Sequence, residues 1–109
     1  MRHPRGYVAA GVAASVWLAA AAAAVAAECR DELIASQSSL QTTSAGIEQA
    51  AAAPPAEKCP AQRRHYAAMM KFRDVLSRCD LSKDRAGRVA GLDASIDRFR
   101  KAMPPGCRP

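Results

Sequence analysis

Three stretches of the chain repeat apolar side chains at helical spacing. In residues 29–52 these side chains recur at alternating intervals of four and three, which places them along one seam of a helix. The seam positions are Cys29, Leu33, Ser36, Leu40, Thr43 and Ile47. Because serine and threonine occupy part of this seam, the predicted helix has a thin apolar face and depends on its neighbours. Pro54 and Pro55 follow, and neither can continue a helix.

The stretch between Cys59 and Cys79 predicts an amphipathic helix over residues 60–79. Pro60 suits the first helical position, because the N–H that proline lacks would have had no partner there. Gln62 and Arg73 interrupt an otherwise apolar arc. The arc comprises His65, Tyr66, Met69, Met70, Phe72, Val75, Leu76 and Cys79, whereas the opposite side carries Arg63, Arg64, Lys71, Asp74 and Arg78.

A third helix is predicted over residues 82–103, ended by Pro104 and capped by Asp80 or Ser82. Two glycines, Gly87 and Gly91, lie inside it, and each costs about 1 kcal/mol relative to alanine. We interpret them as allowing the close approach of a neighbouring element. The apolar stripe of this helix runs through Arg85, Val89, Leu92, Ile96, Phe99 and Met103.

Short connections between three such helices predict an all-α fold, a small antiparallel three-helix bundle. The helix order then selects the pairing of the four cysteines. A helix of about 20 residues is about 30 Å long, whereas a disulfide requires Cα atoms within about 7 Å. Cysteines at opposite ends of one helix therefore cannot bond, which leaves the pairs Cys29–Cys79 and Cys59–Cys107.

Residues 1–27 have the pattern of a cleavable signal peptide, which leaves residues 28–109 as a single helical domain. Arg2, His3 and Arg5 form a basic start, and the run that follows is uncharged and ends in small residues before Glu28. An uncleaved membrane anchor is the competing interpretation, although alanine, which dominates the run, is a weak membrane residue. Export suits the cysteines, because disulfides persist in oxidising compartments.

The composition also indicates the source of the gene and the location of the protein. The chain contains no asparagine and is rich in alanine, arginine and proline, which suggests a GC-rich bacterial gene. We therefore expect a periplasmic or secreted protein. The expected mature chain carries 14 basic and 10 acidic residues, a net charge of +4.

The charge is unevenly distributed along the mature chain. Residues 28–58 contain two basic and five acidic residues, a net charge of −3. Residues 59–109 contain twelve basic and five acidic residues, a net charge of +7. Arg64, Lys71 and Arg78 repeat every seven residues on the second helix, with Arg63 beside them. This basic stripe is suited to an acidic protein or an anionic envelope component, and the alternative is a solvated face that pairs with nearby acids.

Catalytic and cofactor motifs are lacking. The cysteine spacing matches no C-x-x-C redox motif, zinc pattern or haem attachment, and the sequence has no phosphate loop or nucleophile elbow. We expect a protein that is not an enzyme and has no cofactor. Nucleic acid is not the expected partner, because an aromatic stacking platform is missing. The alternative is a soft-metal (copper) or redox carrier that uses His65 and Met69, four residues apart, together with unpaired cysteines.

The sequence thus predicts a small exported helical protein that acts by binding. The expected role is that of an envelope accessory or interaction module that uses the basic face of its second helix, through Arg63, Arg64, Lys71 and Arg78.

Overall fold

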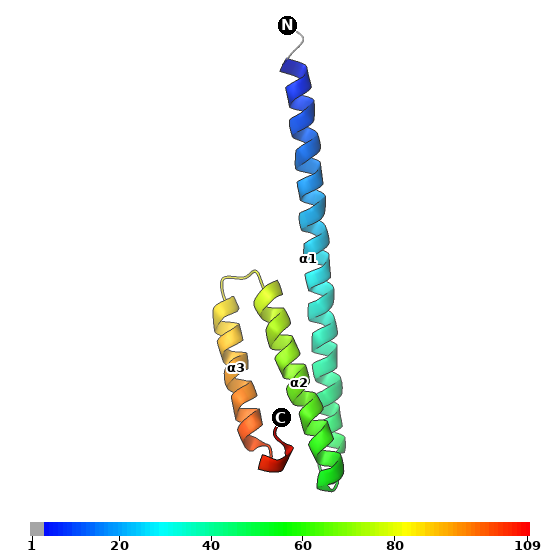
Figure 1. Cartoon of the computed structure of the whole chain (residues 1–109), viewed down its shortest axis with the longest axis vertical. Coiled ribbons are helices and arrows are strands. Elements are labelled where there is room, and N and C mark those ends of the chain that lie inside the picture. The colour runs from blue at the N-terminus through cyan, green and yellow to red at the C-terminus, as the bar shows by residue number, and fades with distance from the viewer. Residues whose placement is uncertain (1–3) are drawn as a thin grey trace.

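The protein is described by a computed structural model that covers residues 4–109, with side chains from residue 16 onward. It contains three α-helices and one short 3₁₀ helix, which confirms the all-helical fold class (Figure 1). These elements are α1 (Pro4–Gln49), α2 (Pro55–Cys79), α3 (Arg85–Ala102) and η1 (Pro105–Cys107). Arg2 and His3 of the predicted signal lie outside the described residues.

The first helix does not begin at residue 29 as predicted, because α1 is continuous from Pro4 to Gln49. Alanine has the highest helix propensity, and neither glycine nor proline occurs between Gly11 and Gly46. The predicted signal segment and the first helix of the domain therefore share one helical rod. Among the residues that the structure describes, no helix has a stretch that is long and apolar enough to cross a membrane.

The other helix ends also differ from the prediction, and proline accounts for most of the differences. Helix α1 ends at Gln49 and not at residue 52, in a turn closed by Ala53 N–H donating to the Ala50 carbonyl at 3.0 Å. Helix α2 begins five residues earlier than predicted, with Pro55 at its first position. Pro60, which was expected to start the helix, lies inside it, so one backbone hydrogen bond is missing there.

The third helix begins at Arg85, three residues later than predicted, and ends at Ala102. Neither of the predicted capping residues caps it. Asp80 instead stays in the preceding turn, where its Oδ1 accepts the Ser82 N–H at 2.8 Å. This hydrogen bond lowers the pKa of the Asp80 carboxyl from its ordinary value. The α2–α3 connection is therefore an Asx turn of the kind that competes with helix formation.

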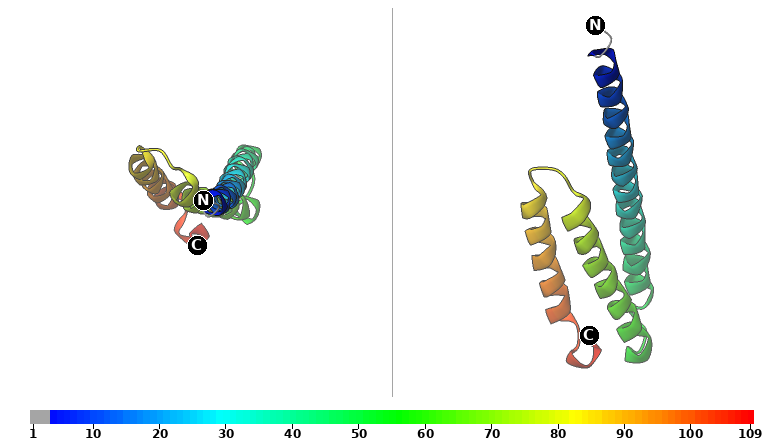
Figure 2. Two further views of the ribbon diagram at one scale, coloured as in Figure 1. Left: turned by 90° about the horizontal axis from the view of Figure 1, so that it is seen from above. Right: turned by 45° about the horizontal axis from the view of Figure 1, so that its top comes forward.

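Helix α2 lies between the other two helices. In Figure 1 the chain passes down α1, returns along α2 and passes down again along α3. Helix α2 packs against α1, α3 and η1, whereas α1 and α3 have no pair of Cα atoms within 8 Å of each other in the described part of the chain. Seen from above, α1 and α3 diverge from α2 like the arms of a V (Figure 2). The bundle is therefore open along one side.

The predicted apolar faces form the contacts between the helices. Ser36 of α1 is only 5% exposed, and its hydroxyl donates to the Leu33 carbonyl at 3.0 Å. One member of the predicted α2 arc is wrong, because Met70 is 45% exposed. The buried apolar side chains are Ala61, Ala68, Met69, Val75, Leu76, Cys79, Ile96, Met103 and Cys107.

An ion pair explains why the charged Arg73 lies among apolar residues of α2. Its guanidinium donates to both carboxylate oxygens of Asp93 on α3, at 2.9 and 3.3 Å. Both side chains are more than a third exposed, so the pair contributes little stability and mainly orients the two helices.

Two disulfides connect the helices, and they join the pairs that the helix order selects. Cys29 of α1 bonds Cys79 at the end of α2, with Cα atoms 5.2 Å apart. Cys59 near the start of α2 bonds Cys107 in η1, with Cα atoms 5.0 Å apart. All four cysteines are thus used, and the structure fits an oxidising compartment.

Candidate interaction surfaces

The four basic residues of the predicted stripe have different surroundings. Arg63 donates through Nε to the Cys107 carbonyl at 2.9 Å and through Nη2 to the Gly106 carbonyl at 3.1 Å. These carbonyls belong to η1, which the disulfide Cys59–Cys107 also holds against α2. The guanidinium of Arg63 therefore fixes the C-terminal turn. The sequence offered no signal for this role, because the turn is 43 residues away along the chain.

Arg78, at the other end of the stripe, is engaged by two carboxylates. Its Nη2 lies 3.1 Å from Glu32 of α1, and its Nε lies 3.5 Å from Asp74 one turn earlier on α2. The alternative expected from the sequence, in which the basic stripe pairs with nearby acidic residues, therefore holds at this end of the stripe.

Arg64 and Lys71 form the remaining part of the basic stripe. Both side chains are exposed, and the structure assigns neither a hydrogen bond nor an ion pair within the described chain. Seven residues of helix separate them, about 10 Å along the helix axis. Two cationic groups are thus presented to solvent on one side of α2.

His65 and Met69 lie on the opposite side of α2, in a groove with a volume of about 590 Å³. Its floor is formed by His65, Met69 and Phe72 of α2. The α1 wall includes Leu40, and the α3 wall includes Leu92. Most of the surface of this groove is apolar. The sequence did not indicate the groove, because the residues of each wall, taken alone, have the pattern of an ordinary buried helix face.

His65 contacts both neighbouring helices. Its Nδ1 lies 2.9 Å from the hydroxyl of Thr43 on α1, and its ring meets Phe99 of α3 edge to face with 5.1 Å between ring centroids. Burial of the imidazole lowers its pKa below the ordinary value, so the neutral form prevails at neutral pH. A neutral imidazole can bind a metal, but the described residues contain no cluster of three or more His, Cys, Asp or Glu side chains placed to hold one.

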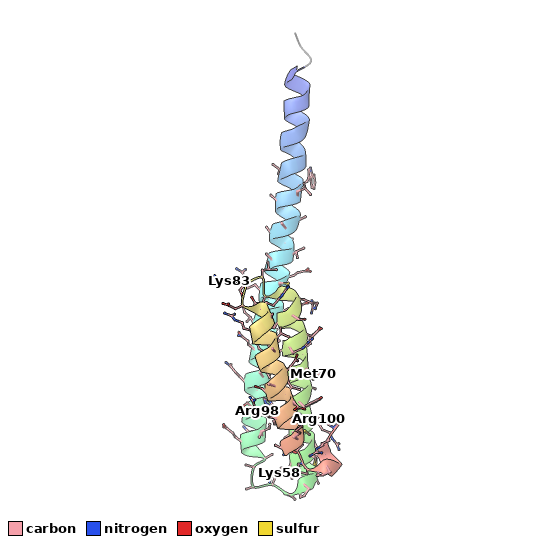
Figure 3. The ribbon with its side chains drawn as sticks, turned by 90° about the vertical axis from the view of Figure 1, so that its left-hand side faces the viewer. Lys58, Met70, Lys83, Arg98 and Arg100 are labelled. Atoms are coloured by element: carbon pink, nitrogen blue, oxygen red, sulfur yellow. A yellow bond between two sulfur atoms is a disulfide. The ribbon has the colours of Figure 1, made fainter. Side chains whose placement is uncertain are left out.

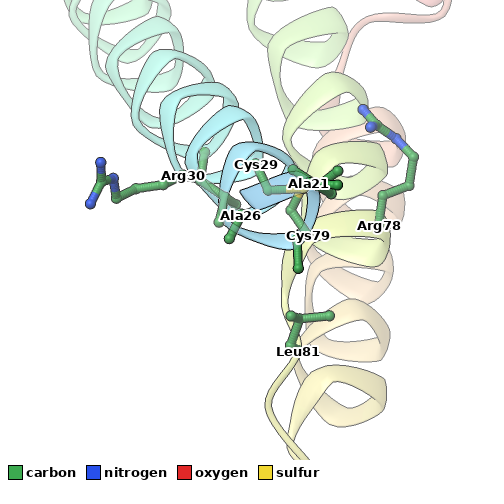
Figure 4. Close-up of a pocket in the computed structure, with 10 residues that line it drawn as sticks. Ala21, Ala26, Cys29, Arg30, Arg78, Cys79 and Leu81 are labelled. Carbon is green, nitrogen blue, oxygen red and sulfur yellow. A yellow bond between two sulfur atoms is a disulfide. The ribbon is translucent and has the colours of Figure 1, made fainter. Parts of the chain in front are cut away.

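A second hollow, of about 540 Å³, surrounds the disulfide Cys29–Cys79 (Figure 4). Leu33, Arg78 and Leu81 form part of its lining. The rest of the lining includes four residues of the predicted signal segment, Ala21, Ala22, Val25 and Ala26. Leu81 is 85% exposed even with this segment in place. Cleavage of the predicted signal segment would therefore eliminate one wall of this hollow.

These arrangements describe a scaffold that presents two surfaces of different chemistry, one cationic and one apolar. No family model matches the chain, and comparisons with curated proteins and with solved structures found no similar protein either.

Proposed function

We propose that the chain is an exported, non-enzymatic binding module, an antiparallel three-helix domain that is released from its signal segment into the periplasm or the medium. The partner is an acidic protein or an anionic component of the cell envelope, bound through the cationic pair Arg64 and Lys71. Arg78 extends this surface by exchanging its intramolecular carboxylates for those of the partner.

The observation that carries the proposal is that Arg64 and Lys71, seven residues apart on α2, are exposed and form no ion pair within the described chain. Some other cationic side chains are engaged within the chain, as Arg73 is with Asp93 and Lys101 is with Asp97 at 2.8 Å. A cation without a carboxylate partner leaves its charge available to a ligand, and a net charge of +7 over residues 59–109 attracts anions to this part of the chain.

The test is a charge reversal that leaves the fold intact. Arg64→Glu combined with Lys71→Glu should abolish capture of the partner from the envelope fraction of the producing cells. Lys83→Glu combined with Arg100→Glu changes the net charge equally, elsewhere on the surface, and should leave capture unchanged. Both double variants should retain the helical circular-dichroism spectrum. Equal capture by the wild type and the Arg64/Lys71 variant would refute the proposal.

The second candidate function is a soft-metal carrier, favoured by one observation: His65 and Met69 line the same groove. The disulfides remove the cysteines from this alternative, since all four are bonded. A neutral imidazole and a thioether are ligands that Cu(I) prefers. Titration of the oxidised protein with Cu(I) under a competing chelator tests it, with Met69→Leu as the variant that should lose the metal. Retention of Cu(I) by this variant, or no uptake by the wild type, would reject this function.

A further inference from the structure

Helices α1 and α2 keep one register along their contact. Residue numbers rise on α1 as they fall on α2, because Cys29 bonds Cys79 and Thr43 Oγ1 lies 2.9 Å from His65 Nδ1. The second pair is fourteen residues further along α1 and fourteen residues earlier on α2. Equal steps along both helices therefore lead from one pair of facing positions to the next.

This register relates the paired and the unpaired cations of the basic stripe. Arg78 faces Glu32 of α1, with 3.1 Å between guanidinium and carboxylate. Seven residues along each helix, two helical turns, the equivalent pair is Lys71 with Ser39. Serine offers a hydroxyl where glutamate offers a carboxylate, so Lys71 has no anionic partner on α1. The carboxylate of Asp74, one turn from Lys71 on α2, pairs with Arg78 Nε at 3.5 Å.

The strip of α1 that borders Arg64 and Lys71 is small, hydroxyl-bearing and uncharged. A further step of seven residues places Gly46 opposite Arg64, and a Cβ built on Gly46 would meet no atom within 4 Å. Residues 33–47 contain no charged side chain. The exposed hydroxyl of Thr42 donates to a carbonyl of its own helix at 3.1 Å, and its oxygen can still accept a hydrogen bond. An anion that approaches the two cations therefore meets hydroxyls and open space, without a carboxylate on this strip to repel it.

We propose that this face, the cationic seam, binds an acidic polysaccharide, a polymer of sugar units that carry carboxylate, sulfate or phosphate groups. The cationic seam consists of Arg64, Lys71, Ser39, Thr42 and Gly46. The inference rests on the proposed function and names the partner of the same cationic pair. The two cations are about 10 Å apart along α2. An extended polymer with recurring charges meets both of them when it runs parallel to the helices, and its sugar hydroxyls then bond the hydroxyls of the seam.

The lack of an apolar anchor distinguishes this partner from an acidic protein. Protein interfaces obtain most of their affinity from large apolar or aromatic side chains near their centre. In α2 and in the part of α1 after residue 28, the exposed large apolar side chains are Ile34 and Met70. Met70 lies about 100° around α2 from Lys71, next to α3 in Figure 3, and Ile34 lies about 140° around α1 from Ser39. The seam therefore suits a ligand made of charges and hydroxyls, and it offers a membrane no side chain to insert.

Binding to polymers of known composition tests the class of partner. In isothermal titration calorimetry the oxidised, exported protein should bind hyaluronan, which carries a carboxylate on every second sugar, and dextran sulfate, but not neutral dextran. The affinity should fall as the salt concentration rises, because the bound cations displace counterions of the polymer. Poly-L-glutamate and phosphatidylglycerol vesicles present anions without sugars. They should bind about tenfold more weakly, because the hydrogen bonds to the seam hydroxyls are lost.

Variants that add a carboxylate to the seam test the geometry without removing a cation. Ser39→Glu should pair with Lys71 as Glu32 does with Arg78, and should weaken hyaluronan binding about tenfold. Gln37→Glu is the matched control. It adds the same charge at an exposed position two residues away, on a different side of α1, and should leave the affinity unchanged.

The glycines allow the same test at the other cation. Gly46→Glu should weaken hyaluronan binding by engaging Arg64, and Gly91→Glu on α3 is its control. A Cβ at either glycine, or at Gly87, meets no atom within 4 Å, so the fold accommodates both variants. The close approach predicted from the sequence at Gly87 and Gly91 is therefore not made within the described chain.

The outcomes separate the polysaccharide from the wider proposal. Loss of affinity from Ser39→Glu but not from Gln37→Glu supports the polysaccharide. Equal effects of these two variants, or no binding to either charged polysaccharide, overturn it. Tighter binding to poly-L-glutamate or to the vesicles also overturns it but leaves the proposed function standing. Unchanged envelope capture by the Arg64/Lys71 double variant would reject both.

Discussion

The disulfide between Cys29 and Cys79 should contribute a large fraction of the folding free energy. Five large apolar side chains, Met69, Val75, Leu76, Ile96 and Met103, are buried in the described structure. A domain of this size typically has a free energy of unfolding of about 4 to 12 kcal/mol. A bond that lowers the entropy of the unfolded chain is therefore a major part of its stability.

The magnitude follows from the length of chain that the bond closes. Cys29 and Cys79 are 50 residues apart, and the chain-entropy model assigns about 4 kcal/mol to a loop of this length. The variant Cys29→Ala with Cys79→Ala removes the bond without leaving a hydroxyl at the buried Cys79 position. Guanidinium chloride denaturation followed by far-ultraviolet circular dichroism should show a midpoint lower by about 2 M, taking a slope of about 2 kcal/mol per M.

The bond between Cys59 and Cys107 provides the comparison, because it closes a loop of nearly equal length, 48 residues. Its removal through the matching pair of alanines should cost about the same, about 4 kcal/mol. A loss of less than about 1 kcal/mol for the Cys29/Cys79 variant, with an unchanged denaturation slope, would refute the reasoning. It would mean that residual helix contacts already restrict the unfolded chain, so that the bond lowers its entropy little further.

Three smaller perturbations test individual contacts. Burial lowers the pKa of His65 in the folded state below 6.5, so folding favours the neutral imidazole. The free energy of unfolding should therefore be greatest above about pH 6.5 and fall as the pH drops toward the lowered pKa. His65→Gln should flatten this part of a pH series of thermal melts. Arg63→Ala should lose about 1 kcal/mol, because two carbonyls of the C-terminal turn lose their donor, whereas Arg64→Ala should change the melting temperature little. Ser36→Ala should gain about 0.5 kcal/mol in chemical denaturation, because alanine is the better helix former and the hydroxyl bonds only a carbonyl within its own helix; a loss of stability would show that the hydroxyl supports the α1–α2 contact.

The helices and their buried faces could be predicted from the sequence because helical periodicity is a local property. The seam of α1 is an example, since Ser36 is buried although its side chain is polar. The helix ends were less predictable, because proline at two positions offers alternative starts. Pro60 lies inside α2, and packing of this helix against two neighbours offsets the missing hydrogen bond there.

The surfaces were the least predictable part of the molecule. The stripe of Arg63, Arg64, Lys71 and Arg78 looks uniform in the sequence, but its two ends contact segments more than 40 residues away. Only the three-dimensional arrangement separates a cation that fixes a turn from one that faces solvent. The groove depends on the relative placement of all three helices, so no single stretch of sequence could have indicated it.

The two disulfides interleave along the chain, and this has a consequence for how the protein is made. Each native bond encloses about 50 residues, whereas cysteines that are neighbours in the sequence are only 20 to 30 residues apart. Closing a shorter loop costs less entropy. In an unstructured chain, non-native bonds between neighbouring cysteines would therefore form a few times faster than the native bonds. The correct bonds therefore require either that α1 and α2 associate before the sulfurs react, or that an isomerase exchanges the early, incorrect bonds. Without an isomerase, the yield of correctly bonded protein thus depends on whether α1 and α2 associate faster than the cysteines form disulfides.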